Sequence, residues 1–337
     1  MSQEGPLPYR ALNDPLREIF TPQVVTRLCK AQSPFLLERL EILSACGPYP
    51  SDTRLANRLR LFRARKASWE TYLSAAFSCG LFEGESGKDL RARLTGLDDR
   101  NFRSAMSECL VCWFLVGVLK LPVKPRPEGN KGKVLELLVD LPEGDMRVEV
   151  KAPYPNDPHK SEWFHDPGPI TRCLKEANKQ FQKGMRNVLF LVFFEDMRLY
   201  WPRDLMIRAF IGEEGEAYAV DTQTHPPKVE AVIARFPTGQ LLNPNYPKPP
   251  PHPHKRIPHF TRVGAVVLVQ ERFNPKGFFP EIFHNVWVIH NPHAGPSVSP
   301  EVWARYPQLF IKEDGVMRWT DGYESWSEMD QRWDGYR

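Results

Sequence analysis

Residues 133–151 read KVLELLVDLPEGDMRVEVK, and this stretch decides the predicted fold. Two apolar runs of strand length flank the segment LPEGD, whose Pro and Gly mark a chain reversal, so the stretch predicts a β-hairpin. Alternate side chains of a strand share a face, so Glu136 and Asp140 point to the same side of the first strand. On the return strand, Glu149 and Lys151 lie together on one face. The polar faces can coincide across the pair, which would place two or three carboxylates beside one lysine.

Carboxylates on adjacent strands suit a hard divalent cation such as Mg²⁺ or Mn²⁺, because these ions prefer oxygen ligands. A lysine two residues beyond the second carboxylate can position a water molecule or stabilise a phosphorane-like transition state. A simpler interpretation is that Glu149 and Lys151 form a cross-strand surface pair that only solvates the sheet.

This arrangement resembles the PD-(D/E)XK superfamily of restriction-endonuclease-like nucleases. In that superfamily an acidic residue on one strand is followed, after roughly ten to twenty residues, by Asp/Glu-x-Lys on the next strand. The segment Glu149-Val150-Lys151 matches the second half of the motif. Glu136 stands where the superfamily usually has Asp, which is a departure, and Asp140 is the alternative first-strand ligand.

The order of the predicted elements extends the resemblance over residues 98–194. A helix over 98–119 precedes the hairpin, and a helix over 170–183 and a buried strand over 187–194 follow it. The resemblance implies an α/β fold with a restriction-endonuclease-like α/β/α core, in which helices flank a mixed sheet. We expect an N-terminal helical region over residues 1–97 and a nuclease-like domain over 98–337, whose C-terminal extension contains β-strands.

Two further residues are candidates through this resemblance. In the superfamily the helix before the hairpin often carries an acid that faces the metal, and Glu108 occupies such a helix among apolar neighbours. A buried carboxylate without a partner is costly, so either a salt bridge or a metal should satisfy Glu108. The superfamily helix after the hairpin carries a Gln or Lys that leans toward the site. Gln180 is the first choice for that role, with Lys183 and Lys179 as alternatives.

The densest positive cluster lies on a helix predicted between Ser51 and Gly80. It indicates either a solvated helix face or a surface that contacts phosphates. The predicted nucleic-acid-binding residues are Arg58, Arg63, Arg65, Lys66 and Lys183.

Composition narrows the classes of function. The 337 residues carry a net charge of only +4, and the six cysteines are few for so long a chain, which argues against a disulfide framework. The N-terminus lacks an apolar signal region, so we expect a cytoplasmic protein without membrane association. No Walker loop, nucleophile elbow or dinucleotide fingerprint is found in the sequence. The sequence neither requires nor excludes a homodimer or a protein partner.

The sequence therefore favours a nuclease that depends on Mg²⁺ or Mn²⁺. The resemblance makes DNA a better candidate substrate than RNA. In this hypothesis the catalytic residues are Glu136, Glu149, Lys151 and Gln180, and the metal ligands come from Glu108, Glu136, Asp140 and Glu149. The alternative is a catalytically inactive nuclease fold that binds nucleic acid or a protein.

Overall fold

The computed structural model describes residues 12–31, 33–46, 48–49, 51–125, 136–154, 168–194, 213–221, 228–236, 262–274, 281–291, 294–311 and 317–319. The helices are α2 (Asp14–Ile19), α3 (Pro22–Lys30), α4 (Pro34–Ser44), α5 (Thr53–Ser78), α6 (Gly84–Thr95), α7 (Asp99–Trp113), the π-helical segment η1 (Phe114–Val118), α8 (Gly168–Gln180) and the 3₁₀ helix η4 (Pro300–Trp303). The strands are β1 (Val123–Pro125), β2 (Leu137–Val139), β3 (Met146–Lys151), β4 (Arg186–Phe194), β5 (Glu213–Asp221), β6 (Lys228–Phe236), β7 (Ala265–Asn274), β8 (Glu281–His290), β9 (Gln308–Ile311) and β10 (Met317–Trp319).

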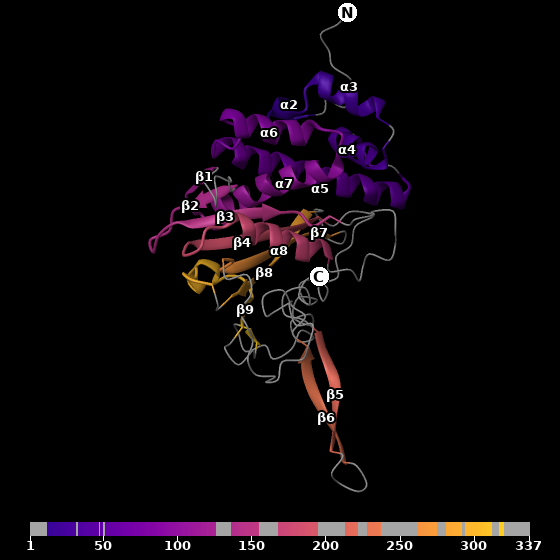
Figure 1. Ribbon diagram of the computed structural model, residues 1–337. Helices are drawn as coiled ribbons and strands as arrows, with labels where there is room; N and C mark the ends of the chain where they lie inside the picture. The colour runs from indigo at the N-terminus through magenta and orange to yellow at the C-terminus, as the bar shows by residue number, and fades with distance from the viewer. Residues whose placement is uncertain are drawn as a thin grey trace, which may run out of the picture.

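Eight of these strands form one mixed sheet in the order β1-β2-β3-β4-β7-β8-β9-β10. The predicted hairpin is β2–β3, and its strands pair antiparallel. The neighbours β3 and β4 are parallel, as are β4 and β7, and α8 makes the crossover between β3 and β4. Strands β5 and β6 form a separate antiparallel hairpin, which projects away from the large sheet (Figure 1).

The two faces of the large sheet carry different helices. On one face, Val148 and Phe190 belong to the same buried cluster as Leu110 of α7. On the other face, Leu189 and Leu191 are also fully buried but lie outside that cluster, and here α8 packs against β4. Helices α2–α7 lie together on the α7 side of the sheet (Figure 1). The α/β class with a mixed sheet and flanking helices is therefore confirmed.

Side-chain caps fix where the long helices begin. The Asp52 side chain accepts a hydrogen bond from the amide of Leu55 at 2.9 Å, and Asp98 accepts one from the amide of Asn101 at 2.7 Å. Helix α5 then packs against both α7 and β8. One buried cluster accordingly extends from Leu12 through the helices to Trp303, so the N-terminal helices share their core with the sheet.

The basic cluster of α5 differs from the predicted nucleic-acid surface. Arg65 is 5% exposed, and its guanidinium pairs with Glu38 at 2.9 Å and with Glu271 of β7 at 3.6 Å. Lys66 is 9% exposed, and burial lowers the pKa of its ammonium group. The positions of Arg65 and Lys66 do not support the prediction that they contact nucleic acid, because both side chains are buried.

The remaining members of that predicted surface are accessible. Arg58 is exposed and pairs with Glu41, and the guanidinium of Arg63 lies 4.5 Å from the centre of the Tyr49 ring. Lys183 is exposed in the turn that follows α8.

Across the described ranges, none of the helices is both long enough and apolar enough to cross a membrane.

Arg65 and Arg58 provide a matched test of the buried ion pairs on α5. Replacing Arg65 with Ala removes a guanidinium that pairs with the 1%-exposed Glu271 in the low-dielectric interior, so we expect the free energy of unfolding to fall by about 3–5 kcal/mol. Replacing Arg58 with Ala removes an exposed pair and should cost less than about 1 kcal/mol. Urea denaturation followed by circular dichroism measures both, and equal effects of the two variants would contradict the assignment.

Candidate active site

The register of the β2–β3 hairpin places two acidic residues opposite each other. Leu137 pairs with Val148, so the next position outward sets Glu136 against Glu149. In an antiparallel pair, side chains that lie directly opposite each other point to the same face of the sheet. Lys151 is two residues beyond Glu149 and shares this face. The structure thus brings together three of the predicted catalytic residues.

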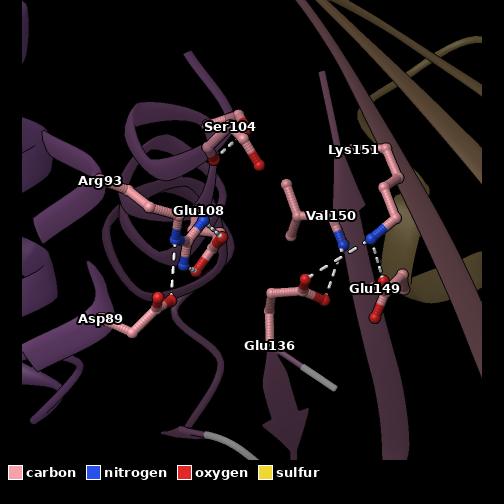
Figure 2. Close-up of polar contacts among 9 residues, drawn as sticks. Asp89, Arg93, Ser104, Glu108, Glu136, Glu149, Val150 and Lys151 are labelled. Carbon is pink, nitrogen blue, oxygen red and sulfur yellow. Dashed lines mark hydrogen bonds and ion pairs between the residues drawn. The ribbon is translucent and has the colours of Figure 1, made fainter. Parts of the chain in front are cut away.

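Direct contacts join these three side chains (Figure 2). Glu136 accepts a hydrogen bond on Oε2 from the backbone amide of Val150 at 3.1 Å. The Lys151 ammonium donates a hydrogen bond to Oε1 of Glu149, and its nitrogen lies 3.8 Å from Oε1 of Glu136. We refer to Glu136, Glu149 and Lys151 as the acid–lysine cluster.

Burial makes the charges of the acid–lysine cluster interdependent. Burial and then the charge of Glu136 raise the pKa of Glu149, which is fully buried. Burial also opposes the ionisation of Glu136, but the Lys151 ammonium, a hydrogen bond from the Glu149 carboxyl and the backbone amide of Val150 together outweigh it and lower the pKa of Glu136. For Lys151, burial is again overcome, and the two carboxyls raise its pKa. These directions favour one proton shared by the two carboxyls, held more strongly by Glu149, beside a charged Lys151.

One oxygen of the cluster fits a cation. Oε2 of Glu149 is buried and has no hydrogen-bond partner among the described residues. An orphaned buried carboxyl oxygen is unfavourable, and a hard divalent ion would satisfy it together with Glu136. Within the part of the chain that the structure describes, no group of three or more His, Cys, Asp or Glu side chains could hold a metal ion. Among the described residues, the candidate ligands at this site are therefore two carboxyls, those of Glu136 and Glu149.

The alternative first-strand ligand lies elsewhere. Asp140 is four residues along the chain from Glu136, a distance of about 13 Å in a strand. Its carboxylate pairs with Lys124 of β1 at 2.8 Å, and both side chains are exposed. Of the two candidates for the first strand, only Glu136 reaches Glu149, and the prediction of Asp140 as a metal ligand is not supported by its position.

Glu108 is satisfied by a salt bridge. Its carboxylate, 2% exposed, makes two hydrogen bonds with the guanidinium of Arg93 at 2.6 and 3.2 Å. Asp89 binds the same guanidinium at 2.9 Å. Figure 2 shows this group and the acid–lysine cluster as two separate sets of contacts. Of the two expectations for Glu108, the salt bridge is the one that the structure contains.

Gln180 and Lys183 are separated from the cluster by the topology of the sheet. In the parallel pair β3–β4, Lys151 lies opposite Leu191 at one end, and Met146 lies opposite Arg186 at the other. Helix α8 returns the chain toward the Arg186 end, about 16 Å away along the strands. Gln180 is the last residue of this helix, and it makes no hydrogen bond with the cluster. The structure does not bring Gln180 or Lys183 to the site.

The start of α8 supplies neighbours that the sequence analysis did not select. The buried thiol of Cys173 lies within electrostatic range of Lys151. Burial raises the pKa of Cys173 to about 12, so the thiol stays neutral, and Arg100 of α7 and Arg172 of α8 both act on it. In a crossover between parallel strands, the helix starts near the end of the first strand. The β3–α8–β4 connectivity is therefore the signal that could have placed the first turns of α8 near Lys151.

Comparison of the chain with protein-family models, curated proteins and solved structures gives no match. Functional assignment therefore depends on the geometry of the site.

The raised pKa of Glu149 leads to a prediction about stability and pH. The unfolded chain loses this proton near pH 4.3, whereas the folded protein retains it, so stability should fall as pH rises from there to the raised folded pKa. Replacing Glu149 with Gln removes the ionisation, and we expect the variant to be more stable than the wild type at pH 7 in the presence of a chelator. Urea denaturation at several pH values measures this difference.

The matched control for this experiment is Asp140→Asn. Its carboxylate belongs to an exposed pair, so the variant should keep the pH slope of the wild type. If Glu149→Gln also kept that slope, Glu149 would not be the group that holds the proton.

Proposed function

We propose that this protein is a metal-dependent nuclease of the restriction-endonuclease-like class, which hydrolyses phosphodiester bonds with DNA as its favoured substrate. One observation carries the proposal, namely that Glu136 and Glu149 face each other across a hairpin with the Lys151 ammonium beside them. The α8 crossover from β3 to the parallel strand β4 supports it, since helix, hairpin, helix and strand follow in the order that the resemblance implies.

Glu136 and Glu149 would hold Mg²⁺ or Mn²⁺ in this proposal. The hydrogen bond from the amide of Val150 fixes the Glu136 carboxylate, so that ligand is already oriented. The orphaned Oε2 of Glu149 provides the second oxygen. When bound, the cation would lower the pKa of an attacking water and polarise a phosphoryl oxygen.

Lys151 serves as a charged hydrogen-bond donor. Its pKa is raised by the two carboxyls, so it remains an ammonium at neutral pH and is unsuited to accept a proton from water. Its roles are to orient the attacking water and to stabilise the negative charge that develops on the phosphate. The side chain is 19% exposed, so part of it reaches solvent.

The proton on Glu149 connects activity to pH. A carboxyl must be ionised to serve as a metal ligand, so loading the site releases this proton. Metal affinity and cleavage should both increase as pH rises through the raised pKa of Glu149.

A second function is a nuclease fold that binds nucleic acid or a protein without cleaving it. The specific observation in its favour is that the cluster is compensated without a metal ion, because the Lys151 ammonium contacts Glu149 and lies 3.8 Å from Glu136, while the raised pKa of Glu149 favours its neutral form. A cluster compensated in this way can persist without a metal ion.

The decisive experiment uses Glu149→Gln, which we expect to be the more stable fold. Loss of activity in this variant cannot then be attributed to unfolding. With Mn²⁺ or Mg²⁺, the wild type should cleave DNA, and both Glu149→Gln and Lys151→Ala should be slower by at least about 100-fold. Isothermal titration with Mn²⁺ should detect a site in the wild type and none in Glu149→Gln.

Asp140→Asn is the control, and it should cleave at the wild-type rate because its carboxylate pairs with Lys124 outside the cluster. Cleavage by Lys151→Ala at the wild-type rate would overturn the assignment of Lys151. A wild type that neither binds Mn²⁺ nor cleaves DNA or RNA would favour the non-catalytic function.

A further inference from the structure

A polar cleft lies next to the end of β3. Its volume is about 410 Å³. Tyr154 is three residues beyond Lys151, Arg100 is in the first turn of α7, and Arg172 is in the second turn of α8. The residues that line the cleft are Ser33, Phe35, Leu97, Asp98, Asp99, Arg100, Tyr154 and Arg172.

Electrostatic contacts connect the cleft to the acid–lysine cluster. The charge of Lys151 acts on the buried thiol of Cys173, which follows Arg172 in the chain. The charges of Arg100 and Arg172 act on the same thiol. The two arginines of the cleft and Lys151 therefore all lie within electrostatic range of the same thiol, at the end of the sheet where β3 ends.

The acids of the cleft already have partners. Asp98 caps α7 through the amide of Asn101 at 2.7 Å. Asp99 binds Nε of Arg103 at 2.7 Å and lies 3.8 Å from a guanidinium nitrogen of Arg39. Arg100, by contrast, is exposed and makes no ion pair with any described residue. Arg100 is therefore a cation of the cleft that can bind a phosphate group.

The cleft also contains an aromatic ring, that of Tyr154. Tyr154 is half-buried, and the guanidinium of Arg103 lies 5.9 Å from the centre of its ring, while Asp99 holds Arg103 in place. An aromatic side chain beside basic groups is the combination with which proteins bind single-stranded nucleic acid, because any base can stack on the ring.

The cleft is the size of a single nucleotide rather than of a long segment. A volume of about 410 Å³ corresponds to a cube with an edge of about 7 Å. A base can stack on Tyr154 only after it has left its own stack and its pairing partner, and this costs least for an unpaired nucleotide.

We propose that this cleft binds single-stranded nucleic acid, with Arg100 and Arg172 on its phosphates and one base stacked on Tyr154. The inference rests on the proposed nuclease function and deepens it by naming the substrate class. The strand leaves the cleft toward Lys151, so the substrates are single strands or the unpaired parts of branched molecules.

The test measures binding of a fluorescent oligothymidine to the full chain by anisotropy, in EDTA so that cleavage plays no part. Tyr154→Ala should weaken binding by about tenfold through the lost stacking, and Tyr154→Phe should retain the wild-type affinity. The double variant Arg100→Ala/Arg172→Ala should bind at least about tenfold more weakly and show a smaller dependence on salt, because two phosphate contacts are lost.

Lys88→Ala is the matched control, since it removes an exposed cation of α6 outside the cleft and should leave the affinity unchanged. Arg100 is exposed, so its single replacement reports on binding even if Arg172→Ala disturbs the fold. Unchanged binding by Arg100→Ala and by Tyr154→Ala would overturn the proposal, as would a duplex that competes as well as the single strand.

Failure of the cleft and failure of catalysis give different results. If the wild type binds the oligothymidine through Arg100 and Tyr154 but never cleaves it with Mn²⁺, the cleft stands and the nuclease function fails. If the wild type cleaves DNA and the cleft variants bind and cleave as it does, the nuclease function stands and the cleft fails.

Discussion

The ion cluster of Glu136, Glu149 and Lys151 is the interaction on which the interpretation of this fold depends. Three ionisable groups share a site in which Glu149 is completely buried and Lys151 is 19% exposed. Desolvation of that extent is expensive, and it is tolerated only when the charges compensate one another. The Lys151 ammonium balances the charge of one carboxylate. The raised pKa of Glu149 favours a neutral second carboxyl, because two buried anions beside one cation would leave a net charge.

The sheet explains why these groups meet. Strand β3 sends Val148 and Val150 into the core beneath α7, so its alternate residues must face α8. The antiparallel register then presents Glu136 on that same face. A shift of one residue would exchange the two faces and bury the charges among the apolar side chains under α7, which makes the register hard to change. The packing of the hydrophobic core therefore fixes the geometry of the polar site.

Much of this could be predicted from the sequence, since alternation and turn residues are local signals. The hairpin and the pairing of Glu136, Glu149 and Lys151 follow from a period of two residues. The burial of Arg65 had a signal as well, because Arg65 stands at helical spacing between Phe62 and Trp69, which are both buried. The partner of Glu108 had no such signal, since Arg93 belongs to the preceding helix and the pair depends on how the two helices pack. Local sequence also could not show which end of α8 lies near the site, because this depends on the three-dimensional path of the chain between β3 and β4.

The N-terminal helices also help to position the site. Arg65 of α5 joins Glu38 of α4 to Glu271 of β7, and the hydroxyl of Tyr72 lies 2.7 Å from Nε2 of His284 on β8. These contacts are buried and polar, so they are directional, and they fix where α5 sits on the sheet. Helix α7 packs between α5 and β3, and its first turn carries Arg100. The position of the polar cleft relative to Lys151 is thus set by helices that precede the hairpin in the sequence. Residues before 98 shape the site although they contribute none of its acids.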